Sequence, residues 1–60
     1  MIITINVKNE KLFAMFLDGM NKRYKISQKR KHSIFEIEKP YFSQDEVLIK
    51  NFSIELAKTI

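Results

Sequence analysis

The sequence predicts a small α+β domain with the element order β-α-β-β-α, and the spacing of its apolar residues carries this prediction. Residues 2–7 alternate as a strand does, and residues 23–38 pair with each other as a hairpin. Residues 10–20 and 43–60 repeat apolar side chains at helical spacing. A right-handed first crossover then gives a three-stranded antiparallel sheet in the order 1-3-2, with two helices on one face.

The composition limits the class of protein. The chain has 60 residues, enough for a single domain spanning residues 1–60, and its 45% apolar content can build a core. The absence of cysteine excludes disulfide frameworks, zinc ribbons and redox motifs, and one glycine cannot make a phosphate-binding loop. The longest apolar run, residues 12–17, is too short for a signal peptide or a membrane span, so we expect a cytoplasmic protein without membrane contact.

The first strand is followed by an amphipathic helix. Asn9 is placed to accept a hydrogen bond from a free amide of the first helical turn, where Glu10 suits the positive end of the helix dipole. Gly19 and Asn21 tolerate the left-handed conformation that ends a helix. The apolar arc between these signals consists of Leu12, Phe13, Phe16, Leu17 and Met20.

The hairpin is predicted from its pairing, because one register satisfies both faces of the sheet. This register takes Lys29 to His32 as the loop. Its apolar pairs are Ile26 with Phe35 and Tyr24 with Ile37, and its charged pairs are Lys25 with Glu36 and Arg23 with Glu38. We expect the charged pairs to form salt bridges. The loop lacks the Gly or Asn of a tight turn, so we expect a mobile turn of four residues or more.

The last predicted element is a helix that starts after Pro40. Ser43 and Glu46 have the spacing of a capping box, in which each side chain satisfies the free amide of the other residue. Its expected buried face consists of Leu48, Ile49, Phe52, Leu56 and Ile60. Val47 and Ile54 lie on the opposite side, where one copy of the chain does not bury them.

The positive charge is concentrated in residues 22–32, which contain six basic residues and no acid. We expect this segment to contact phosphates, mainly at the hairpin tip. An alternative interpretation, an exposed turn whose charges only aid solubility, is equally compatible with the sequence. The candidate nucleic-acid-binding residues are Lys22, Arg23, Lys25, Lys29, Arg30, Lys31 and His32. Lys22 is expected near the tip.

The first strand is the second candidate site. In the predicted order it lies at an edge of the sheet, and an uncovered apolar edge favours pairing with another chain. We therefore expect a homodimer, or addition of a partner's strand, through this edge. The edge residues are Ile2, Ile3, Thr4, Ile5, Asn6 and Val7.

The sequence offers little for catalysis. His32 is expected in a turn without an orienting acid beside it, and Glu36 and Glu38 are expected to pair with basic residues rather than bind a metal. We therefore expect no enzymatic activity, no metal and no cofactor.

Two functions remain open. The first is a small nucleic-acid-binding protein, DNA or RNA, that contacts phosphates through the hairpin tip and acts as a regulator. The alternative is a protein-interaction module, an inhibitor or accessory subunit, that binds an acidic surface or pairs through its first strand.

Overall fold

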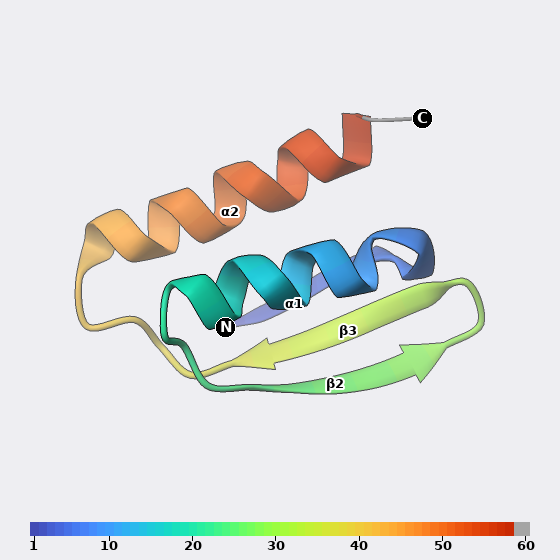
Figure 1. Cartoon of the computed structure of the whole chain (residues 1–60), viewed down its shortest axis with the longest axis horizontal. Coiled ribbons are helices and arrows are strands. Elements are labelled where there is room, and N and C mark those ends of the chain that lie inside the picture. The colour runs from blue at the N-terminus through green and yellow to red at the C-terminus, as the bar shows by residue number, and fades with distance from the viewer. Residues whose placement is uncertain (59–60) are drawn as a thin grey trace.

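The element order confirms the predicted α+β fold. A computed structural model describes residues 1–58, in which β1 (Ile2–Asn6), a 3₁₀ turn (η1, Val7–Asn9) and α1 (Glu10–Gly19) are followed by β2 (Tyr24–Lys29), β3 (His32–Ile37) and α2 (Ser43–Lys58) (Figure 1). The sheet is antiparallel in the order β1-β3-β2. Both outer strands are therefore sheet edges.

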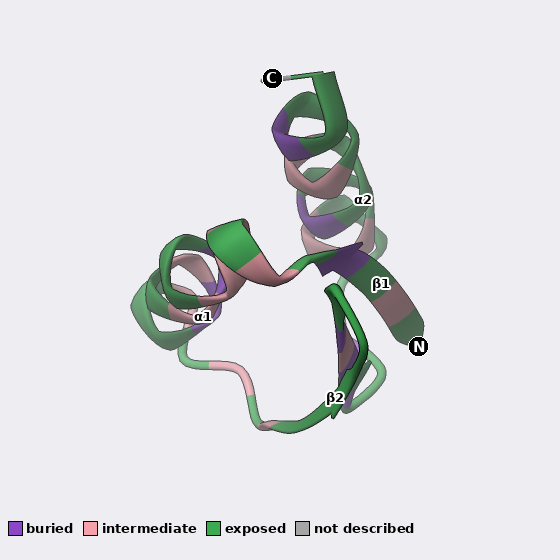
Figure 2. Cartoon of the chain, turned by 90° about the vertical axis from the view of Figure 1, so that its right-hand side faces the viewer, coloured by how far each residue is buried: buried purple, intermediate pink, exposed green. Residues whose placement is uncertain are grey.

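The core lies between the sheet and the two helices, which Figure 2 shows in a view from the end of the molecule. Ser33, Phe35 and Ile37 of β3 are buried, whereas Glu36 between them is exposed, so one face of the sheet is covered and the other is open. The Phe13 ring packs edge-on against Phe35 with centroids 4.8 Å apart. The buried apolar residues are Ile5, Phe13, Leu17, Phe35, Ile37, Ile49 and Leu56.

The hairpin register is confirmed, but the predicted loop is wrong. Ile26 lies opposite Phe35 and Lys25 opposite Glu36, as expected. Lys29 also pairs with His32, which leaves only Arg30 and Lys31 in the turn. Arg30 has φ 59°, so it takes the positive φ that a two-residue turn requires and that glycine usually supplies.

The caps of α1 differ from those predicted at one end. The side chain of Asn9 makes no cap hydrogen bond; its Nδ2 donates instead to the Leu56 carbonyl at 3.4 Å, and Asn6 caps the preceding η1 turn. At the other end Asn21 has φ 60°, with its amide bonded to Asp18 and the Lys22 amide to Leu17. These two bonds form a Schellman motif, so α1 ends where the sequence predicts.

The start of α2 corrects the predicted capping box. Among the side-chain hydrogen bonds of residues 1–58, none joins Ser43 to Glu46; the helix begins at Ser43 itself, and the Asp45 amide donates to the Phe42 carbonyl at 3.1 Å. The helix position was predicted correctly, but not the group that caps it.

The buried faces of the helices are narrower than predicted. Leu12 and Leu48 were expected in the core, yet they are 50% and 53% exposed. Each lies at the border of its apolar arc, and the Phe16 and Phe52 rings stack between the helices with centroids 4.3 Å apart. Val47 and Ile54 are exposed, as predicted, and Ile60 lies outside the described residues.

Candidate nucleic-acid interface

The tip of the β2–β3 hairpin presents four exposed side chains, two on the strands and two in the turn. Lys29 ends β2, Arg30 and Lys31 form the turn, and His32 begins β3. His32 therefore sits in the ladder, paired with Lys29 and Asn6, rather than in the expected loop. Because both flanking residues are paired, the tip is a short, fixed turn.

Two other segments bring further basic residues to the tip. The Val7 amide donates to the Lys31 carbonyl at 2.9 Å, which places Lys8 beside the turn. Lys11 lies in the first turn of α1, and Figure 1 shows the start of α1, the end of α2 and the hairpin turn at one end of the molecule, called here the hairpin end.

The hairpin end carries the net charge. It contains six basic and two acidic side chains, and the remainder of the described residues 1–58 contains five of each. The six basic residues are Lys8, Lys11, Lys29, Arg30, Lys31 and Lys58, and the two acidic ones are Glu10 and Glu55. The excess positive charge, which the sequence shows in residues 22–32, therefore lies at the hairpin end of the fold.

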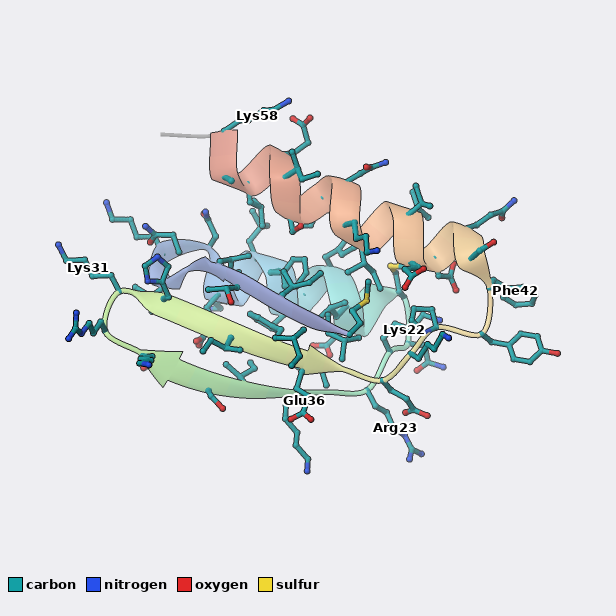
Figure 3. All side chains as sticks on the ribbon, turned by 180° about the vertical axis from the view of Figure 1, so that it is seen from behind. Lys22, Arg23, Lys31, Glu36, Phe42 and Lys58 are labelled. Atoms are coloured by element: carbon teal, nitrogen blue, oxygen red, sulfur yellow. The ribbon has the colours of Figure 1, made fainter. Side chains whose placement is uncertain are left out.

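The structure separates two predicted binding residues, Lys22 and Arg23, from the tip. Lys22 was expected nearby, but it lies at the opposite end, called here the loop end, where residues 20–23 and 38–42 connect the elements (Figures 1 and 3). Its Nζ bonds the Asp45 carboxylate at 2.8 Å. Arg23 precedes β2, so roughly 20 Å of strand separates it from Lys29.

Arg23 and Lys25 do not form the predicted salt bridges. Lys25 lies opposite Glu36, and the Glu38 amide donates to the Arg23 carbonyl at 3.1 Å, so the neighbours are correct. Within residues 1–58, however, neither basic side chain comes within 4.0 Å of a carboxylate. Exposed pairs gain little from closing, so both cations stay extended in solvent.

Glu10 fixes the underside of the hairpin to α1, a role that the sequence did not reveal. Its Oε1 accepts hydrogen bonds from Ser33 Oγ at 2.6 Å and from Gln28 Nε2 at 3.0 Å. The bond from Ser33, followed by that from Gln28, lowers the pKa of Glu10 below its usual 4.5, against a smaller opposing effect of burial. The hairpin register was the available signal, because it pairs Gln28 with Ser33 and so puts both donors on the face that α1 covers.

A shallow hollow beside the tip opens on the uncovered face of the sheet. It is lined by Thr4, Lys29, Arg30, His32 and Ile34. Lysine and arginine beside a hydroxyl are groups that bind phosphate oxygens. The arrangement can therefore hold a phosphate at the surface without enclosing it.

The hairpin end is three strands wide. Because Val7 bonds Lys31, pairing of the first strand with β3 reaches the turn itself. Three strands span roughly 10 Å between outer backbones before side chains are added, whereas a major groove is about 12 Å wide and admits a two-stranded ribbon. The tip can therefore lie across phosphates but cannot enter a groove.

The edge of β1 has unpaired groups at alternate residues. Bonds from Val7 to Lys31 and from Ile37 to Met1 show that the odd residues of this strand bond β3. Ile2, Thr4 and Asn6 consequently direct their amides and carbonyls away from the sheet. Beside Thr4 and Asn6, the end of α2 borders a hollow that also contains Ser53 and Ala57.

Metal sites and membrane-spanning helices were also sought in the part of the chain that the structure describes. No three His, Cys, Asp or Glu side chains there gather as a metal site. Neither helix, as far as it is described, has the length and apolar character to cross a membrane. Comparison with protein-family models, curated proteins and solved structures finds no match.

Proposed function

We propose that this protein is a small, non-enzymatic, cytoplasmic nucleic-acid-binding protein that contacts phosphates through the hairpin end and acts as a regulator by occupying or positioning nucleic acid. The observation that carries this proposal is the identity of the turn. Arg30 and Lys31 occupy a two-residue turn at which glycine or asparagine would fold more easily. Of the two, only Arg30 takes a positive φ, so keeping arginine there costs conformational energy, and phosphate contact gives a reason for that cost.

The test is fluorescence anisotropy of labelled duplex DNA, single-stranded DNA and RNA at several salt concentrations. Contact with about four duplex phosphates gives a slope of log affinity against log salt near −3.6. The variant Lys29→Ala, Arg30→Ala, Lys31→Ala should weaken duplex binding and reduce the magnitude of the slope by about 2.7.

A matched variant controls for net charge. This control variant, Arg23→Ala, Lys25→Ala, Lys39→Ala, also removes three positive charges, but none of its residues lies at the hairpin end. Duplex affinity should then stay close to that of the unaltered protein. Equal losses in both variants would mean that net charge alone attracts DNA, and absence of binding at low salt would refute the proposed function.

The β1 edge favours a second candidate, a protein-interaction module that pairs with a second copy or with a partner's strand. Its residues Ile2–Asn6 carry no charge, whereas the other edge strand carries Lys25 and Lys29, which discourage pairing. The outward groups of Ile2, Thr4 and Asn6 are free to bond an antiparallel strand.

Thr4→Pro separates the two candidates. It removes an amide that points away from β3, so it blocks edge pairing while sparing the internal ladder. Ile5 is unsuitable for proline, since it is buried and its amide belongs to the ladder with β3. If Thr4→Pro abolishes self-association or partner binding and leaves phosphate binding intact, the edge serves a separate interaction.

A further inference from the structure

We propose that the nucleic acid is bound as a single strand, one of whose bases stacks on Tyr41 at the loop end. This inference rests on the proposed function and adds the class of ligand and a second contact point. Tyr41 was not among the residues predicted from the sequence to bind.

Tyr41 is held outward from the fold. Pro40 before it is buried, whereas the Tyr41 side chain is 91% exposed, more than any other large apolar side chain of the described residues. The neighbouring Phe42 ring meets it edge-on, with centroids 5.0 Å apart. One face of the Tyr41 ring is therefore available to a flat partner, and every nucleic-acid base has such a face.

Charges beside Tyr41 favour an anionic occupant. A hollow next to the ring is lined by Lys22, Arg23, Glu38 and Lys39, together with Asn21 and Pro40. Lys22 is bonded to Asp45, so Arg23 and Lys39 face Glu38 with one positive charge in excess. A ring beside uncompensated cations fits a nucleotide, in which a base and a phosphate are joined.

A row of cations connects the two ends of the molecule. Arg23 directly precedes β2, and Lys25 and Lys29 lie on it, so the three side chains share the open face of the sheet. Arg23 and Lys25 are about 6.6 Å apart along the strand, and Lys25 and Lys29 about 13 Å, with Ser27 between them. Figure 3 shows Arg23 pointing away from the helices, with Lys31 and Phe42 at opposite ends. Glu36 and Glu38 lie one strand inward, so the phosphates follow the outer edge.

The width of the hairpin end also favours a single strand over a duplex. Because three paired strands reach the turn, the tip cannot enter a groove of a duplex. A duplex therefore contacts only the basic side chains of the tip. A single strand can bend along the row and expose its bases to Tyr41. Binding should therefore be tighter for single strands than for duplexes and largely independent of sequence.

The experiment compares Tyr41→Ala and Tyr41→Trp on labelled oligo(dT), which does not pair with itself, and on duplex DNA. Loss of one stacked base should weaken oligo(dT) binding by about 5- to 100-fold, whereas tryptophan should preserve it. Duplex affinity should be unchanged in both variants. Met15→Ala, which truncates another well-exposed apolar side chain on α1, should change neither affinity.

Each failure has its own signature. If the unaltered protein binds neither probe, the proposed function fails. If it binds duplex DNA through the tip but oligo(dT) affinity is the same in Tyr41→Ala, only the stacking assignment is overturned. The Arg23, Lys25, Lys39 variant supplies an independent check, because it should weaken oligo(dT) binding and spare duplex binding.

Discussion

Arg30 and Asn21 are the two residues other than glycine with positive φ in the described chain, and they have different reasons for it. Asn21 closes α1, and asparagine is among the residues that tolerate this conformation. Arginine has no such advantage, which explains why the turn could not be predicted from the sequence. The pairing of Lys29 with His32 imposes the conformation on Arg30.

Replacing Arg30 with glycine should therefore separate stability from binding. Arg30→Gly relieves the left-handed conformation, so the free energy of unfolding should rise by about 0.5 to 1 kcal/mol. Removal of the guanidinium should at the same time weaken phosphate binding. Asn21→Gly is the matched control, which should leave duplex binding through the tip unchanged. Thermal unfolding and anisotropy measure both quantities, and an Arg30→Gly protein with undiminished affinity would contradict the reason given for arginine.

Glu10 makes a second prediction at this scale, in the pH dependence of stability. Its hydrogen bonds from Ser33 and Gln28 lower the pKa in the folded state below 4.5. Folding thus favours the ionised form of Glu10. Its contribution to the free energy of unfolding is complete above the pKa of the unfolded state, and it is lost as the pH falls through the lower pKa of the folded state. Between neutral pH and about pH 3, Glu10→Gln should flatten the dependence of Tm on pH. Parallel curves for Glu10→Gln and the unaltered protein would contradict this assignment.

Among the elements, α1 shows how far a helical pattern determines burial. Leu12 and Phe13 belong to the same predicted arc, yet Phe13 is fully buried against Phe35 and Leu12 is half exposed. The spacing indicates an apolar side of the helix, and the position of α2 beside it decides which part of that side is covered. The same reason explains Leu48 on α2.

The contrast between these neighbours can be measured by urea unfolding. Phe13→Ala removes a large buried ring and should cost about 3 to 5 kcal/mol, a large share of the total expected for a domain of this size. Leu12→Ala should cost less than about 1 kcal/mol. Similar losses in the two variants would mean that the core extends to Leu12.

The sheet was more predictable than the helix faces. Cross-strand pairing gave the correct register because apolar side chains alternate with charged ones on both strands of the hairpin. The salt bridges expected from that register are absent between Arg23, Lys25 and their neighbours, since exposed lysine and arginine gain little from them. For the binding site, the sequence indicated the tip, but only the fold could bring Lys8 and Lys11 to it and take Lys22 away.

For the whole molecule, surface area bears on self-association. The accessible surface is 4908 Å², whereas a globular monomer of 7.2 kDa exposes about 4,100 Å². Part of this surface is the uncharged β1 edge, where the outward backbone groups of Ile2, Thr4 and Asn6 can pair with a second copy. We therefore predict a mass of twice 7.2 kDa in sedimentation equilibrium at micromolar concentration, reduced to 7.2 kDa by Thr4→Pro. A mass of 7.2 kDa for the unaltered protein throughout would contradict pairing with a second copy.

The uneven placement of charge has a further consequence for kinetics. A molecule whose net charge lies at one end of a 31 Å long axis has a strong electric dipole along that axis. The field of a polyanion orients such a molecule before contact, so encounters begin with the hairpin end. The association rate should therefore fall steeply as salt is added. Stacking on Tyr41 follows from this oriented complex, and its loss should therefore appear mainly in the dissociation rate.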